Sequence, residues 1–113
     1  MAESERIMRG GNLFEDIPED LTKERFDTIL EKGGLRLERI VSRGHATAED
    51  QWYDQPSDEW VTLLQGGAAI VIDGRKAPVV MRPGDHLLLP ARCRHRVAWT
   101  DPDVDTVWLA LHF

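Results

Sequence analysis

The pattern of apolar and polar positions changes character after Gly34. From there on, short runs of β-branched and aromatic residues recur at intervals of roughly ten residues, with turn residues between them. This spacing is typical of an all-β sandwich or barrel. The predicted strands are Leu35 to Val41, Trp60 to Gln65, Ala68 to Ile72, Ala77 to Arg82, His86 to Leu89, His95 to Trp99 and Thr106 to Phe113.

The segment that precedes these runs has a different pattern. Between Leu21 and Lys32 the apolar residues Phe26, Ile29 and Leu30 recur at helical spacing. A capping residue and an end signal flank this stretch, Thr22 and Gly33-Gly34. The sequence therefore predicts one short amphipathic helix with Phe26 and Leu30 facing the core.

Length and composition limit the domain organisation. With 113 residues, 42% of them hydrophobic and 30% charged, the chain has the composition of one globular domain. We expect an N-terminal segment, residues 1–34, to carry the helix and residues 35–113 to form the β-barrel of that domain.

Charge and cysteine usage exclude several classes of protein. A net charge of −6 argues against nonspecific binding to nucleic acid or to anionic lipid. The single cysteine, Cys93, excludes an intrachain disulfide and every multi-cysteine zinc site. Neither a signal-peptide core nor a run of roughly 20 apolar residues is found. We therefore expect a soluble cytoplasmic protein with no membrane or nucleic-acid partner.

Two spacings in the second half of the chain carry the most chemical information. In the segment PGDHLLLPARCRHRVAW, Gly84 is followed after five residues by Pro90, and His95 lies five positions beyond that proline. In EWVTLLQG, six residues separate Glu59 from Gly66. These spacings resemble the second motif, and the closing half of the first motif, of the cupin superfamily of small jelly-roll barrels. The resemblance covers Leu35 to Phe113 and implies metal ligands at Glu59 and His95.

The same comparison shows departures from the family pattern. Where cupins carry two histidines before the glutamate, this chain has Tyr53 and Gln55, or Trp52 and Asp54. Half of the usual shell of three histidines and one glutamate is therefore missing. Gln55 can add an amide oxygen as a ligand, and His45 can replace an imidazole.

Strand periodicity places the candidate groups on one face. Alternate side chains of a strand share a face, so Cys93, His95, Val97 and Trp99 are predicted to point inward and Arg92, Arg94 and Arg96 outward. The same alternation groups Glu59 with Val61 and Leu63. An inward glutamate is costly unless it is paired or bound to a cation.

Two interpretations of this inward pair remain open. Glu59 and His95, assisted by Gln55 and His45, bind a divalent ion such as zinc, iron, manganese or nickel, or they form a structural hydrogen-bonded pair. The predicted pocket residues around them are Tyr53, Cys93, Trp52 and Trp99, with Trp108 as a further candidate. Salt bridges from the outward arginines to Asp101 or Asp103 are expected.

Three classes of function follow from these alternatives. The first is a cupin with a divalent metal and a small-molecule pocket inside the barrel, either a metal-dependent enzyme of unknown substrate or not an enzyme. The second is a metal-free binding or sensor module for a small molecule. The third is an assembly protein, since cupin barrels pair through their sheets and Trp60 faces outward; the resemblance implies a homodimer.

Overall fold

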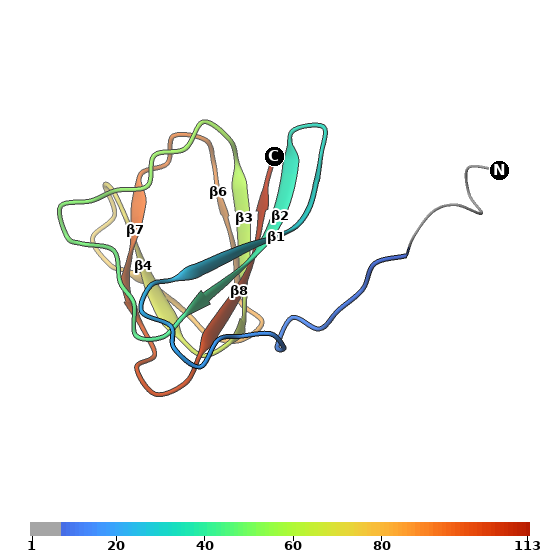
Figure 1. Ribbon diagram of the computed structural model, residues 1–113. Helices are drawn as coiled ribbons and strands as arrows, with labels where there is room; N and C mark the ends of the chain where they lie inside the picture. Colours follow the sequence, from blue (N-terminus) through green and yellow to red (C-terminus); the bar gives the residue numbers. More distant parts are fainter. Residues whose placement is uncertain (1–7) are drawn as a thin grey trace.

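Two antiparallel β-sheets that face each other make up the fold of residues 8–113, which the computed structural model describes (Figure 1). The larger sheet has the strand order β1-β2-β8-β3-β6, and the smaller has the order β5-β4-β7. The strands are β1 (Arg25–Lys32), β2 (Leu35–Ser42), β3 (Glu59–Gln65), β4 (Ala68–Ile72), β5 (Val79–Met81), β6 (His86–Leu89), β7 (His95–Thr100) and β8 (Thr106–His112). The all-β prediction is confirmed.

The predicted N-terminal helix is wrong. Residues 25–32 form β1, which pairs with β2 as an antiparallel hairpin at the edge of the larger sheet. The glycines interpreted as a helix end, Gly33 and Gly34, have φ values of +54° and +85° and join Lys32 to its partner Leu35. Two consecutive residues with positive φ fit the twist of a two-residue hairpin turn. Leu30, predicted to face the core, lies on the outer face opposite Leu37 and is 41% exposed, whereas Phe26 lies on the inward face opposite Ile40 but is 50% exposed.

The core lies between the sheets and is built by the inward positions of both. The buried apolar cluster contains Val61, Leu63, Ala68, Ile70, Met81, Leu89, Trp108 and Ala110. Ile40, Ile72, Val79, Leu87, Cys93 and Val97 pack against it. Because β2, β3 and β8 each alternate inward and outward residues, polar residues at inward positions of these strands must also lie inside.

Two arginines fasten the segment before β1 to the outside of the larger sheet. The Arg39 guanidinium, in β2, donates to the backbone carbonyls of Leu13, Glu15 and Asp16. It also pairs with the Asp27 carboxylate at 2.7 Å. Arg43 donates to the carbonyls of Pro18 and Glu19 and pairs with Asp105. These contacts hold residues 13–19, the strap, against the larger sheet, to which β1 is joined through its pairing with β2.

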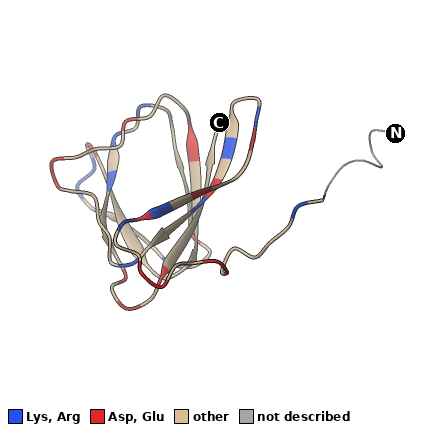
Figure 2. Cartoon of the chain, viewed as in Figure 1, with Lys and Arg blue, Asp and Glu red and all other residues tan. Residues whose placement is uncertain are grey.

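Charged side chains are distributed over both sheets and their loops (Figure 2). The outward arginines pair with other partners than predicted: Arg92 with Asp54 at 3.4 Å and Arg94 with Asp73 at 3.1 Å. Asp101 instead accepts hydrogen bonds from the backbone of its own turn, at Asp103 and Val104. Within residues 8–113 no helix has the length and apolar character needed to cross a membrane.

Candidate functional site

Glu59 and His95 meet inside the molecule, one from each sheet. Glu59 is the first residue of β3, His95 is the first residue of β7, and Glu59 Oε1 lies 3.5 Å from His95 Nε2. Both residues are buried, with 7% and 6% of their surface exposed. The separation is long for a hydrogen bond. The pair is thus an ion-pair contact that leaves Glu59 Oε1 without a hydrogen-bond donor in the described structure.

Backbone contacts fix the orientation of the His95 ring. Nδ1 lies 2.8 Å from the carbonyl oxygen of Cys93, which directs Nε2 into the interior. The Tyr53 ring stacks on the imidazole with the centroids 5.5 Å apart, and the backbones of Tyr53 and His95 exchange two hydrogen bonds. The imidazole therefore has a single well-supported position.

The charge of His95 depends on opposing effects. Burial lowers the pKa of its imidazole, but the interaction with the Glu59 carboxylate and the contact with the Cys93 carbonyl together raise that pKa above its usual range. Burial, followed by the nearby Glu24 carboxylate, raises the pKa of Tyr53. The Tyr53 hydroxyl therefore stays protonated at neutral pH.

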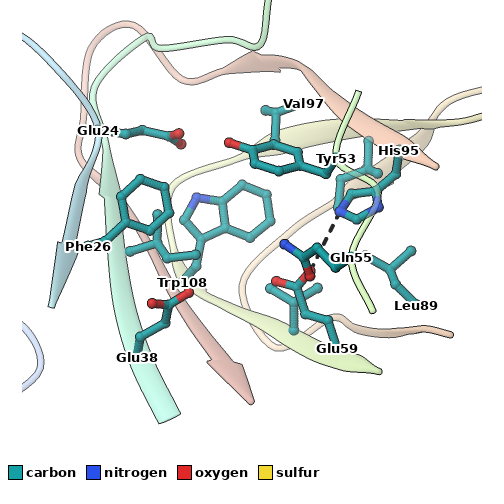
Figure 3. Close-up of a pocket in the computed structure, with 13 residues that line it drawn as sticks. Glu24, Phe26, Glu38, Tyr53, Gln55, Glu59, Leu89, His95, Val97 and Trp108 are labelled. Carbon is teal, nitrogen blue, oxygen red and sulfur yellow. Dashed lines mark ion pairs between the residues drawn. The ribbon is translucent and has the colours of Figure 1, made fainter. Parts of the chain in front are cut away.

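A cavity of about 60 Å³ opens beside this pair (Figure 3). Its polar lining comes from both sheets and from the segments before β1 and β3, namely Glu24, Glu38, Tyr53, Gln55, Glu59 and His95. Its apolar lining consists of Phe26, Ile40, Val61, Ile70, Leu89, Val97 and Trp108. Figure 3 shows Gln55 and Glu59 beside the His95 ring, Glu24 facing the Tyr53 hydroxyl, and the Trp108 indole between these two sides.

A second buried pair lies next to Glu59. His112 Nε2 is 2.8 Å from Glu38 Oε1 and 4.0 Å from Glu59 Oε2. Glu38 is inward on β2, and His112 is the residue opposite Glu59 in the pairing of β8 with β3. Two glutamates and two histidines therefore follow one another across the interior, in the order Glu38, His112, Glu59 and His95.

Of the residues predicted for the site, the structure brings Glu59, His95, Gln55 and Tyr53 to the cavity. It does not bring His45 there, because the His45 ring accepts a hydrogen bond from the Arg43 backbone N–H through Nδ1. Trp52 lies on the outer surface, where the guanidinium groups of Arg94 and Arg96 stack on its ring.

The remaining predicted pocket residues also lie outside the cavity lining. Cys93 packs against the edge of the core and contributes its carbonyl oxygen to His95. Trp99 points outward and is 46% exposed. The cause is a bulge in β7: Val97 pairs with Ile70 and Trp99 pairs with Ala69, so Ala98 has no partner on β4. One extra residue reverses the alternation that strict parity predicts.

Sequence reasoning missed Glu24, Phe26 and Glu38. Glu38 had a usable signal, since it alternates with Ile40 and Ser42 on the inward face of β2. Glu24 and Phe26 belong to the stretch interpreted as a helix. Trp108, suggested as a further pocket residue, does line the cavity, and its indole N–H donates to Ser42.

The donor set fits a divalent ion incompletely. His95 Nε2, Glu59 Oε1 and the unpartnered amide oxygen of Gln55 offer one imidazole, one carboxylate and one amide. Among residues 8–113, no three His, Cys, Asp or Glu side chains are grouped so that they could hold a metal ion. The transition-metal sites to which imidazole and carboxylate are suited usually have at least three such protein ligands.

Comparison with solved structures finds many chains of the same fold, some of them from uncharacterised bacterial proteins. The chain is 53% identical to a protein from Ralstonia eutropha JMP134 named "putative mannose-6-phosphate isomerase", with a TM-score of 0.90 over 93% of this chain and 97% of that one. Two others share the fold. A cupin superfamily protein from Desulfitobacterium hafniense DCB-2 has 16% identity, a TM-score of 0.69 and coverage of 86% and 83%. A protein from Thermus thermophilus has 15% identity, a TM-score of 0.73 and coverage of 93% and 96%.

Two further comparisons, with curated proteins and with family models, gave different outcomes. A comparison with curated proteins finds no match. The family model described as a cupin domain matches residues 40–112, from β2 to the end of β8. That match includes both motif spacings and strands of both sheets, so the chain belongs to the cupin family.

Proposed function

We propose that this protein binds a small polar molecule in the cavity beside Glu59 and His95, without a metal ion. One observation carries the proposal: Glu59 Oε1 and Gln55 Oε1 are buried at this cavity and have no hydrogen-bond partner among residues 8–113, the nearest donor to Glu59 Oε1 being His95 Nε2 at 3.5 Å. Buried polar groups in proteins are paired with protein, water or ligand, and an orphaned acceptor destabilises the protein by about 1–3 kcal/mol. A ligand that donates hydrogen bonds would satisfy both atoms.

A second candidate function is the binding of a divalent metal ion in the same cavity, beside Glu59 and His95. It is favoured by the contact between His95 Nδ1 and the Cys93 carbonyl, which is the support that metal-bound histidines commonly have. Glu59, His95 and Gln55 would hold the ion, and the ion would act as a Lewis acid on a bound oxygen. The incomplete donor set is the reason for ranking this candidate second.

An isomerase acting on a sugar phosphate, which the name of the Ralstonia relative suggests, is not proposed for this chain. Three glutamates line the cavity, and within the part of the chain that the structure describes its lining includes neither lysine nor arginine. A phosphate monoester would lack the cationic donors that proteins use to bind it.

The substitution Gln55→Met tests the leading proposal. Methionine keeps the volume but removes the unpartnered acceptor, so the free energy of unfolding of the ligand-free protein should rise by about 1 kcal/mol. The response to a bound small molecule should fall. The measurement is urea unfolding, combined with thermal unfolding against a panel of metabolites in the presence of EDTA.

The outer residue Gln51 supplies the matched control, since Gln51→Met changes an exposed glutamine outside the cavity. A metabolite response that persists in EDTA and is lost only in Gln55→Met supports the metal-free site. A response that appears only after Mn²⁺ or Zn²⁺ is added supports the second candidate. If Gln55→Met destabilises the protein, the amide is not an orphan and the leading proposal loses its basis.

We further propose that two copies of the chain pair through the outer face of the larger sheet. One large apolar residue from each of its strands lies in a single row on that face, in the order Leu30, Leu37, Leu111, Trp60 and Leu88. Leu88 is 54% exposed and Leu30 is 41% exposed. A continuous apolar row across a whole sheet is typical of an interface rather than of a solvated surface.

The substitution Leu88→Glu is expected to convert a dimer into a monomer at micromolar concentration, as measured by sedimentation velocity. It places a charge in the desolvated row, which weakens association at least about tenfold. Val80, equally exposed but on β5 of the other sheet, provides the control Val80→Glu. A wild-type monomer, or equal dissociation by both variants, would refute pairing through this face.

A further inference from the structure

The cavity has a strongly one-sided charge. Among residues 8–113 its ionisable lining consists of three carboxylates, one imidazole and the neutral Tyr53 hydroxyl, with no lysine or arginine. Arg36 approaches the Glu38 carboxylate to 3.7 Å, but its side chain is 45% exposed and lies outside the cavity lining. Glu38 is paired with His112, and Glu59 contacts His95, but the three carboxylates outnumber these two histidines, so the cavity still favours a cation.

The unpartnered atoms favour the same kind of ligand. Glu59 Oε1 and Gln55 Oε1 accept hydrogen bonds and cannot donate them, and the Glu59 side chain is more than nine-tenths buried. Figure 3 shows both side chains directed toward the same space beside the His95 ring. A group with several N–H donors in close proximity satisfies both oxygens at once.

Aromatic rings complete the wall of the cavity. Phe26, Tyr53 and Trp108 all line it. The Trp108 N–H is already used in its hydrogen bond to Ser42, so the ring face is what the indole offers. Aromatic faces attract cations through their quadrupole, most strongly for tryptophan and where water is excluded.

We infer that the ligand of this cavity carries a protonated amine. Its ammonium group donates to Glu59 and Gln55 and lies within reach of the aromatic wall, and its carbon chain packs against the apolar lining. A volume of about 60 Å³ corresponds to roughly two water molecules, so the enclosed part of the ligand is a head group of a few non-hydrogen atoms. The inference rests on the proposed ligand site and adds the chemical class of the ligand.

The test compares three probes of similar size and different charge at neutral pH, in EDTA, by isothermal titration calorimetry on the full chain. The probes are n-propylammonium chloride, 1-propanol and sodium propionate. We expect propylammonium to bind at least tenfold more tightly than propanol and propionate not to bind.

Two variants locate the binding site. Glu59→Gln should weaken propylammonium binding at least tenfold, and Glu24→Gln, which changes a less buried carboxylate of the same cavity, should weaken it severalfold. If Glu59→Gln fails to fold, Glu24→Gln retains the test. Glu49→Gln removes an equal charge from an exposed loop position outside the cavity and should leave binding unchanged.

The possible outcomes distinguish failure of the amine assignment from failure of the proposed ligand site itself. Binding of propanol or propionate with equal or greater affinity than propylammonium would overturn the assignment of an amine and leave the ligand site standing. Binding of none of the three probes, together with no metabolite response in the Gln55 experiment, would overturn both. Propylammonium binding that Glu24→Gln, Glu59→Gln and Glu49→Gln weaken equally would show attraction by net charge alone and refute the site.

Discussion

Gly66→Ala is expected to destabilise the protein by about 4 kcal/mol, the largest effect of any glycine-to-alanine substitution in residues 8–113. Gly66 lies between β3 and β4, where the chain crosses from one sheet to the other, and has a φ of +87°. A Cβ atom there would lie 2.7 Å from Thr106 Cα and would also overlap the Thr106 side chain. Thr106 is fully buried at the start of β8 and hydrogen-bonded to Gly67, so it cannot move aside.

The control for this variant separates crowding from backbone strain. Gly74 has the same φ of +87°, but a Cβ atom at that position meets nothing within 4 Å. Gly74→Ala should therefore lower the free energy of unfolding by only about 1 kcal/mol, the cost of holding an alanine in the left-handed conformation. Urea unfolding of both variants measures the difference, and equal losses would show that the contact with Thr106 has no energetic consequence.

Arg39→Met should reduce the free energy of unfolding by about 3 kcal/mol and release residues 8–16 from the larger sheet. Arg39 is 7% exposed, and methionine keeps much of its apolar stem while removing every donor. Three backbone carbonyls and the Asp27 carboxylate then lose their hydrogen bonds to this guanidinium. Chemical unfolding measures the stability, and amide hydrogen exchange of residues 8–16 measures the release.

Arg25 provides the matched control because it contacts the same Asp27 carboxylate from a more exposed position. Exposed ion pairs contribute about 0–1 kcal/mol, so Arg25→Met should have a small effect and leave the exchange of residues 8–16 unchanged. If Arg25→Met accelerates this exchange as much as Arg39→Met does, the strap depends on Asp27 rather than on the carbonyl contacts.

Asp27 also gives this region a dependence on pH. Burial raises the pKa of Asp27, but the hydrogen bonds from Arg39 and Arg25 lower it more, to below the reference value of 3.8. Asp27 therefore contributes stability that is present above pH 3.8 and lost as the pH falls through its pKa in the folded protein. In Arg39→Met the free energy of unfolding should therefore fall less with decreasing pH than it does in the wild-type protein.

The sheets could be predicted from the sequence because most strands keep a simple alternation. Leu35 to Val41, Ala68 to Ile72 and His86 to Leu89 coincide closely with β2, β4 and β6. Glu59 and His95 could also be placed inside, since each is followed two residues later by an inward valine. Their spacing to Gly66 and Pro90 added the family, which periodicity alone does not identify.

The helix prediction failed because a bulge mimics helical spacing. In β1 the register shifts between Thr28 and Leu30, so Ile29 is an extra residue and Leu30 moves to the outer face. Phe26, Ile29 and Leu30 then match the spacing of an amphipathic helix although the backbone is extended. Periodicity over one short segment cannot distinguish the two.

The second bulge explains the error at the other end of the site. Alternation along β7 holds for His95 and Val97 but fails at Trp99, because Ala98 is the extra residue. No residue type near Ala98 signals that irregularity, which arises from the pairing with β4. The Glu38–His112 pair could not be predicted for a related reason: it depends on how β2 and β8 align, which is a long-range property.

The position of β1 has a consequence for exchange between the cavity and solvent. β1 contributes Phe26 to the cavity wall, but it is an edge strand that pairs only with β2 in the described structure. Segments held by one ladder of backbone hydrogen bonds open at a lower free energy than the core of a fold. If a molecule binds in the cavity as proposed, its lifetime would be coupled to fraying of this hairpin, a local event, rather than to global unfolding of the two sheets.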